Sequence, residues 1–180
     1  VSTQGIYGGP AYIYRNIVDF RQGVNADRPT PEKPAGELKN YHVYLMHGRP
    51  FLGVESLHFY QNTLVCPAHV DGYLHRMLYN TSEITQRRVF NNICVYLNTY
   101  RPASLRAGME KMDIQADGNL HWCPVPGAEP PKDYLERVRH SAVSKANQAK
   151  YPPGWEANSF VADPKFAAFG MAQDAKNDYR

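Results

Sequence analysis

Proline-rich stretches constrain the fold of this chain more than any other feature of its sequence. The chain has 14 prolines in 180 residues, and many of them fall in residues 24–37, 124–131 and 151–153. Proline fixes φ and lacks a backbone donor, so these stretches cannot lie inside a helix or a central strand. Residues 24–37 and 151–180 therefore predict extended arms. Free ends of this kind are usually disordered unless they are held, so we expect other chains to hold them.

Apolar periodicity predicts helices in several of the remaining segments. In residues 11–22, Ile13, Ile17 and Phe20 recur at helical spacing. The clearest pattern predicts a helix over residues 83–99, because Ser82 is a good N-cap and an apolar stripe follows it. Further helices are predicted over three other segments, residues 70–79, 103–111 and 131–150.

Short strands are predicted between these helices. Residues 41–46 alternate and are rich in β-formers, and residues 51–65 predict one or two more strands. The pair Asp117-Gly118 predicts a hairpin turn between residues 113–115 and 120–122. We identify no internal repeat. Together these patterns predict an α+β fold, a small mixed domain of short strands plus three or four helices, with extended N- and C-terminal arms.

The same reading divides the chain into three parts. Residues 1–37 form an N-terminal arm with a short helix and a Pro-rich linker, residues 38–125 form the small α+β domain, and residues 126–180 form a C-terminal helix and an extended aromatic tail. Aromatic side chains in otherwise polar, extended sequence are suited to fill pockets on a neighbouring protein. The predicted partner-binding residues are Tyr7, Tyr12, Trp155, Phe160, Phe166 and Phe169.

Charge and hydropathy exclude some functions. The net charge is +3 with a pI near 8.7, and the basic residues form no stripe, which argues against nucleic-acid binding. No apolar run approaches the roughly 18–20 residues needed to cross a bilayer, so we expect no transmembrane segment and leave peripheral membrane contact open. The first residue is Val1 rather than Met, which fits either trimming of an initiator Met or removal of a targeting segment.

The cysteines and histidines supply the main candidate chemistry. Three cysteines argue against a disulfide framework, although one bridge between Cys66 and Cys123 remains open. Cys66 and His69, together with His121 and Cys123, have the composition of a tetrahedral zinc site. We expect no other cofactor. Cys66 with His69 or His75 could alternatively form the nucleophile and base of a hydrolase.

A short motif near the start supports a second kind of enzyme. The residues Ile13-Tyr14-Arg15 are similar to the aromatic-Arg opening strand of ADP-ribosyltransferases. This resemblance implies a small effector-type transferase as an alternative function.

The sequence thus favours a protein that works through its contacts. We expect a non-catalytic accessory or structural subunit of a large multi-subunit assembly, which clamps neighbouring chains with its arms. The slight basicity, the Tyr- and Pro-rich arms, the few cysteines and the non-Met start favour a mitochondrial membrane complex, either a respiratory complex or an ATP synthase. The alternatives are a small enzyme of one of the two kinds above, or a virion structural protein, with a cytoplasmic or virion location.

Overall fold

The structure is a computed structural model that describes residues 9–19, 56–66, 86–96, 113–124, 131–167 and 169. These residues form a largely parallel β-structure with two short helices, α2 (Pro131–Arg139) and α3 (Ala142–Asn147). The strands are β1 (Ala11–Tyr14), β2 (Ile17–Asp19), β3 (Ser56–Tyr60), β4 (Thr63–Cys66), β5 (Gln86–Phe90), β6 (Ile93–Tyr96), β7 (Asp113–Asp117), β8 (Leu120–Trp122) and β9 (Phe160–Val161).

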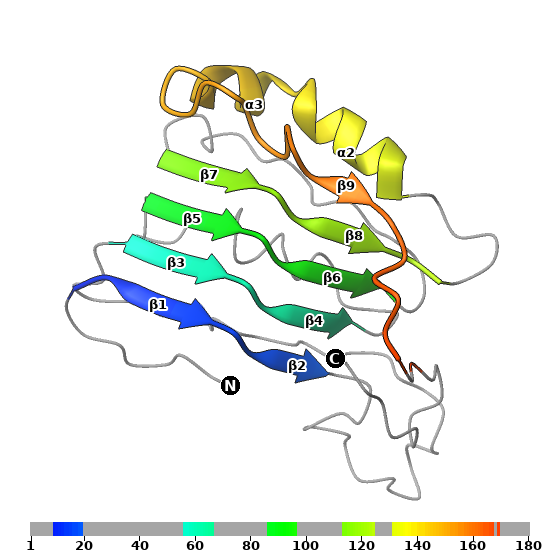
Figure 1. Ribbon diagram of the computed structural model, residues 1–180. Coiled ribbons are helices and arrows are strands. Elements are labelled where there is room, and N and C mark those ends of the chain that lie inside the picture. The colour runs from blue at the N-terminus through cyan, green and yellow to red at the C-terminus, as the bar shows by residue number, and fades with distance from the viewer. Residues whose placement is uncertain are drawn as a thin grey trace, which may run out of the picture.

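The strands belong to two sheets that lie side by side (Figure 1). The first sheet has the order β1-β3-β5-β7, the second has the order β2-β4-β6-β8-β9, and every pairing is parallel. The chain passes from a strand of the first sheet through a bend directly into the matching strand of the second. We call each such strand-bend-strand unit a rung. Four rungs stack in the order of the sequence, and this is the arrangement of a β-solenoid.

Each bend consists of two residues with constant roles. The first residue has a left-handed backbone, which is unfavourable for most side chains but less so for Asn and Gly. The second residue is always asparagine. The left-handed residues are Arg15 (φ 55°), Gln61 (φ 56°), Asn91 (φ 55°) and Gly118 (φ 65°). A Cβ at Gly118 would also lie 2.4 Å from Oδ1 of Asn91, so the neighbouring rung favours glycine there.

The bend asparagines Asn16, Asn62, Asn92 and Asn119 form a continuous hydrogen-bonded ladder, which we call the asparagine ladder. Oδ1 of Asn92 accepts the backbone N–H of Asn62 (3.0 Å) and its Nδ2 (3.1 Å). The backbone N–H and Nδ2 of Asn92 donate in turn to Oδ1 of Asn119, both at 3.0 Å. Nδ2 of Asn92 also donates to the carbonyl of Phe59 (3.2 Å). The ladder thereby satisfies polar groups that are buried at the junction of the two sheets.

The core lies on the inner faces of the strands. One inner column consists of Ile13, Phe59, Val89 and Ala116, which are paired from rung to rung, and the last three are fully buried. The next column includes Arg87 between Leu57 and Ile114. Arg87 is also fully buried, and its burial lowers its pKa to about 10.

The two helices cover the end of the solenoid beside the fourth rung (Figure 1). Leu135 and Val138 of α2 are buried, and so is Trp155 in the segment that follows α3. The sequence predicts one helix over residues 131–150, but the helix is interrupted at His140-Ser141. Ser141 instead acts as the N-cap of α3, because its side chain accepts the backbone N–H of Ser144 (3.1 Å). Among the described residues, no helix is long and apolar enough to cross a membrane.

The prediction of a small α+β domain with three or four helices is wrong. Two of the predicted helices, in residues 11–22 and 83–99, lie where the first and third rungs lie. The bend explains the error. It shifts the alternation of inward and outward side chains by one residue between the strand before the bend and the strand after it. Tyr14 and Ile17 therefore point outward although they are three residues apart, and this spacing imitates a helical stripe.

Two further expectations are corrected by the rungs. Asp117-Gly118 does not make a hairpin, because β7 and β8 belong to different sheets. The chain also does contain a repeat, which is hidden by unequal spacing: successive ladder asparagines are 46, 30 and 27 residues apart. The predicted strand at 41–46 and the helices at 70–79 and 103–111 lie outside the described residues.

The asparagine ladder gives the first testable prediction. We expect Asn92→Ala to lower the free energy of unfolding by about 2–4 kcal/mol, because it leaves the buried backbone N–H of Asn62 without its acceptor and also removes the bonds to Asn62 Nδ2 and to the Phe59 carbonyl. Asn16→Ala should cost clearly less, since Asn16 is half-buried and has a described ladder neighbour on one side only. Urea denaturation of both variants measures the difference, and equal losses would contradict the role of the ladder.

Candidate functional site

The predicted metal ligands are not gathered into a site by the described part of the structure. His121 lies on the inner face of β8, where its Nε2 is 3.5 Å from Oε2 of Glu156, and both side chains are fully buried. Cys123 is half-buried just after β8. Cys66 is the last residue of β4, and its side chain is not among those that the structure describes. His69 lies outside the described residues. No group of three or more potential metal ligands occurs among the described residues. Zinc binding by these four residues stays a prediction.

The predicted partner-binding residues have different environments. Trp155 is 1% exposed, and its indole N–H donates to the carbonyl of Ile114 (2.6 Å), so its ring packs inside this chain. Phe160 on β9 is 50% exposed, and Tyr12 on β1 is 56% exposed. Tyr7 lies outside the described residues.

The last two predicted aromatics pack against the chain itself. The ring centroids of Phe166 and Phe169 lie 6.3 Å and 5.2 Å from that of Trp122, which follows Leu120 and His121 in β8. The two phenylalanines are 5.5 Å from each other. The aromatic tail predicted for partner binding thus contributes a cluster against the second sheet.

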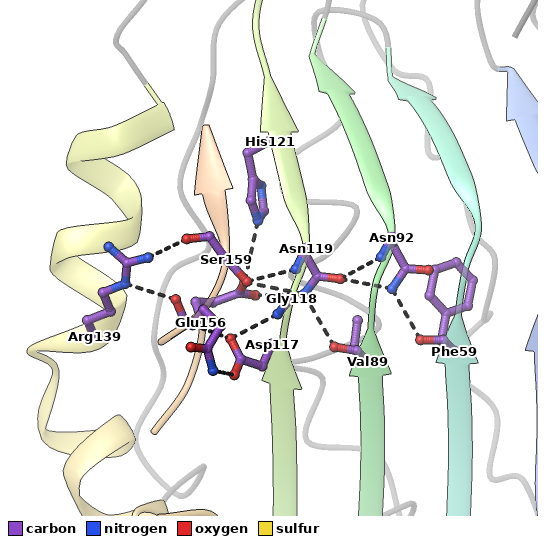
Figure 2. A network of polar contacts seen from close by, with 11 residues as sticks. Phe59, Val89, Asn92, Asp117, Gly118, Asn119, His121, Arg139, Glu156 and Ser159 are labelled. Carbon is purple, nitrogen blue, oxygen red and sulfur yellow. Dashed lines mark hydrogen bonds and ion pairs between the residues drawn. The ribbon is translucent and has the colours of Figure 1, made fainter. Parts of the chain in front are cut away.

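The fourth rung is closed by the C-terminal segment (Figure 2). The backbone N–H of Asn119 donates to Oγ of Ser159 (2.8 Å), so Ser159 accepts the bond that a further asparagine would accept. Nδ2 of Asn119 donates to both carboxylate oxygens of Glu156, each at 3.3 Å. The ladder therefore ends on a serine and a buried carboxylate.

Backbone contacts cover both strand edges at this end. The N–H of Glu156 donates to the carbonyl of Ala116 in β7 (2.6 Å), and the N–H of Phe160 donates to the carbonyl of Asn119 beside β8 (3.0 Å). Arg139 of α2 fixes the covering segment, since its Nε and Nη2 donate to the carbonyls of Glu156 (2.8 Å) and Ser159 (2.5 Å). We call this the closed end.

Asp117 adds a second set of bonds at the closed end. Its carboxylate accepts the backbone N–H and the Nδ2 of Asn158, both at 2.6 Å, and the backbone N–H of Gly118 at 2.9 Å. It also accepts the hydroxyl of Tyr151 (2.9 Å). Burial, together with this contact to a carboxylate, raises the pKa of Tyr151 to about 12.

The first rung is open by comparison. β1 and β2 are edge strands, and no described strand lies beyond them. Asn16 donates its N–H (3.1 Å) and Nδ2 (3.0 Å) to Oδ1 of Asn62, so the first rung is bonded to the second. Its own Oδ1 accepts no hydrogen bond from any described residue, whereas Oδ1 of each later ladder asparagine accepts two. We call this side of the first rung the open end.

Exposed apolar side chains are concentrated at the two ends of the stack. In the second and third rungs, the described side chains are buried or half-buried except for the polar residues Gln61, Gln86 and Asn91. Among the described residues, the exposed large hydrophobic side chains lie either in the first rung or on β9: Tyr12 (56%), Tyr14 (49%), Ile17 (57%), Phe160 (50%) and Val161 (40%). Ile17 and Phe160 terminate the same outward column, which runs through Thr63, Ile93 and Leu120.

The outer face of the first sheet carries rows of stacked side chains. Tyr14 lies on Tyr60 with centroids 5.2 Å apart and planes 4° apart, and Tyr12 lies on His58 at 4.7 Å. Farther along, Arg88 forms an ion pair with Asp113 (2.7 Å). Tyr12 and Tyr14 are the first residues of these rows, and no described strand lies beyond them.

Comparison of the chain with protein-family models, with curated proteins and with solved structures found no match in any of the three. The site is therefore interpreted from its geometry alone.

Sequence reasoning did not single out the ladder asparagines. The signal that could have found them is an asparagine preceded by a polar residue or glycine, with alternating side chains on both sides. It occurs as Tyr-Arg-Asn-Ile, Tyr-Gln-Asn-Thr, Phe-Asn-Asn-Ile and Asp-Gly-Asn-Leu. The four segments share little else, so composition and helical periodicity outweighed the pattern.

The closed end gives the second prediction. We expect Arg139→Ala to lower the free energy of unfolding by about 2–3 kcal/mol, because two charge-assisted bonds to the covering segment are lost. Amide exchange in residues 155–161 should rise more than exchange in β3 and β5. Lys145→Ala, on the exposed side of α3, is the control and should change neither quantity. An Arg139→Ala variant with wild-type exchange in residues 155–161 would show that the arginine does not hold the segment.

The third prediction concerns pH. Burial opposes ionisation of Asp113, but hydrogen bonds from Arg88 and Gln86 and the charge of Arg88 outweigh it, and the pKa is lowered overall. A lowered pKa in the folded state stabilises the fold above the ordinary pKa of about 4, and this contribution disappears as the pH falls through the folded-state value. Asp113→Asn should therefore be less stable than wild type at pH 7, and the gap should close in acid.

Chemical denaturation from pH 7 to pH 2 measures this gap. Arg88→Gln should lose most of the acid-sensitive part of the stability, because it removes the partner that lowers the pKa of Asp113 most. A gap between wild type and Asp113→Asn that is independent of pH would contradict the assignment.

Proposed function

We propose that this protein is a non-catalytic structural subunit of a larger protein assembly, and that it attaches to its neighbour through the open end. The observation that carries the proposal is the difference between the two ends of the solenoid. One end has its strand edges and its ladder bonded by residues 155–162 and by α2. The other end leaves two strand edges, one ladder acceptor and three large apolar side chains uncovered by described residues.

An open solenoid end is a strong site for protein association. Unpaired N–H and C=O groups of an edge strand offer a template for a strand from another chain, and proteins otherwise block such edges. The strands β1 and β2 carry no proline to block pairing. Tyr12 and Tyr14 supply large apolar area with a polar tip, as is common at protein interfaces.

The buried polar groups favour a structural role over catalysis. His121 and Glu156 are the closest acid-base pair in the described core, and both side chains are fully buried. Glu156 accepts two bonds from Asn119, and its backbone is fixed by Arg139. A general acid or base must reach a substrate atom. These two residues instead hold the covering segment in place.

The proposed attachment site differs from the arms that the sequence favours. Residues 151–162 pack against the fourth rung, with Trp155 and Ser159 buried. The exposed large hydrophobic side chains of this segment are Phe160 and Val161 of β9. The interface that we propose is therefore the first rung, with Tyr12, Tyr14 and Ile17.

The fourth prediction tests the attachment in the source cells. A photo-reactive amino acid placed at Ile17 should give a discrete cross-linked adduct with a protein, identified by mass spectrometry. The same probe at Phe160 is the matched control, because Phe160 has similar exposure and ends the same outward column at the closed end. The proposal requires an adduct at Ile17 and a much weaker one at Phe160. The absence of any protein adduct at Ile17, or equal labelling at both positions, would overturn it.

A further inference from the structure

We infer that the covering segment of the closed end, residues 155–161, is an autoinhibitory strap. It is an incomplete fifth rung that occupies the edges of the fourth rung, and it gives way to a complete strand-bend-strand unit of another polypeptide. This inference goes beyond the proposed function, because it concerns the opposite end of the stack and uses no residue of the first rung as an interface.

The covering segment follows the register of the rungs. In the second, third and fourth rungs, the residue after the ladder asparagine donates its backbone N–H to the carbonyl of the ladder asparagine in the rung before. These bonds, each of 2.8 Å, run from Thr63 to Asn16, from Ile93 to Asn62 and from Leu120 to Asn92. Phe160 makes the same bond to Asn119 (3.0 Å), and β9 continues in parallel beside β8. Ser159, which precedes Phe160, therefore has the position of a fifth ladder asparagine.

This fifth rung is incomplete over the first sheet, where no described strand lies beyond β7. Two single donors bind that edge instead. The indole N–H of Trp155 donates to the carbonyl of Ile114, and the backbone N–H of Glu156 donates to the carbonyl of Ala116, both at 2.6 Å. These contacts block two carbonyls of β7 without adding a strand to the first sheet.

The bend of the fourth rung shows the same difference from a complete rung. In the second and third rungs, the first bend residue donates its backbone N–H to a carbonyl of the next rung: Gln61 to Phe90 (3.1 Å) and Asn91 to Asp117 (3.2 Å). The equivalent N–H of Gly118 donates to the carboxylate of Asp117 in its own rung (2.9 Å). The Asp117 side chain thus replaces a carbonyl that a complete fifth rung would present.

The covering segment uses two residues where the ladder uses one asparagine. Oδ1 of Asn92 accepts both the backbone N–H and the Nδ2 of Asn62, at 3.0 Å and 3.1 Å. At the closed end, Ser159 accepts the N–H of Asn119 (2.8 Å), and the Glu156 carboxylate accepts its Nδ2 at 3.3 Å. The Glu156 side chain is fully buried, and burial of a carboxylate costs free energy. A complete rung would bind both groups of Asn119 with one neutral amide and would also pair with β7, so we expect it to compete with the covering segment.

Arg139 of α2 is the latch of the covering segment (Figure 2). Its Nε and Nη2 donate to the carbonyls of Glu156 (2.8 Å) and Ser159 (2.5 Å), so one side chain holds two carbonyls of the segment. Its Nη1 donates to Oε1 of Glu136 on the same helix (2.9 Å). The Arg139 side chain is 26% exposed and contacts none of the rungs through these bonds. Its removal should therefore weaken the covering segment and leave the rungs intact.

The first three rungs show what binds an edge of this kind. Each is covered by a parallel strand-bend-strand unit whose second bend residue is an asparagine. The occupant that we infer is a polypeptide segment of the same pattern, which adds one strand to each sheet and one asparagine to the ladder. Addition of a strand to a sheet edge is a recurring mode of peptide recognition, in which main-chain hydrogen bonds supply the affinity.

The inference is tested with the purified full chain and a fluorescent peptide of residues 86–96, the third rung, in which Cys94→Ser prevents disulfide formation. Fluorescence anisotropy measures the dissociation constant. Arg139→Ala should bind the peptide at least about tenfold more tightly than wild type, because a weakened covering segment competes less for the same edge. Lys145→Ala, on the exposed side of α3, should bind it like wild type.

A second peptide tests the role of the ladder. The same peptide with Asn92→Ala lacks the amide that would accept the two N–H groups of Asn119. It should bind the Arg139→Ala protein at least about tenfold more weakly than the first peptide does, because those donors lose their acceptor. Equal affinity of the two peptides would show that the bound segment does not extend the ladder, and would overturn the inference.

Hydrogen exchange locates the bound peptide. In the Arg139→Ala protein, the peptide should protect the amides of β7 and β8 and should raise exchange in residues 155–161, which it displaces. Protection of residues 11–19 in place of β7 and β8 would mean that the peptide adds to the open end, and this result would overturn the inference.

The remaining outcomes also decide the matter. Equal affinity of the peptide for wild type and Arg139→Ala, or no binding to either, overturns the strap. Circular dichroism checks that the variants fold. Ser159→Ala, which removes the acceptor of the Asn119 N–H, should also bind the peptide more tightly than wild type, and it decides the comparison if Arg139→Ala does not fold. The photo-probe at Ile17 tests the proposed function separately, because none of these outcomes depends on the open end as an interface.

Discussion

The asparagine ladder is the interaction on which the rest of the structure depends. Each two-residue bend turns the chain from one sheet into the other, and a turn of this kind leaves backbone groups buried between the sheets. The ladder satisfies them: Asn62, Asn92 and Asn119 each accept two N–H groups from the rung before and donate to a strand carbonyl of that rung. Because each amide serves two rungs, the ladder also fixes their register, and the inner columns of side chains align as a result.

A ladder has two ends, and the protein treats them differently. At the closed end, Ser159 and Glu156 replace the missing asparagine, and Arg139 holds the segment that carries them. Terminal repeats of solenoids usually need such a cap, because the last rung would otherwise expose its edges and apolar side chains. The open end keeps those features. Each end of the stack thus has two strand edges and a terminal ladder asparagine. At the closed end the described chain covers these groups, and at the open end no described residue covers them.

The sequence predicted little of this fold, and the reason is specific. The alternation of a strand is interrupted at each bend, so that outward residues such as Phe90 and Ile93 are three apart and resemble a helix face. The bend residues Arg15 and Gln61 are not turn formers, and their left-handed conformation is stabilised by stacking and not by local preference. The repeat is hidden because the segments between rungs differ in length. Of the predicted partner-binding residues, Tyr12 and Phe160 are exposed. Trp155 is instead buried in the segment that caps the fourth rung, and composition alone does not reveal that cap.

Exposure at the first rung has a physical meaning that the tail aromatics lack. In a stacked structure, strand side chains are covered largely by their equivalents in the neighbouring rungs, so a row exposed at one end marks a surface that no described rung covers. Ile17 and Phe160 show the contrast, since they end one column at opposite sides. At Phe160, α2 and Arg139 already close the stack. At Ile17, the strand edges, the ladder acceptor and the end of the apolar column are covered by no described residue.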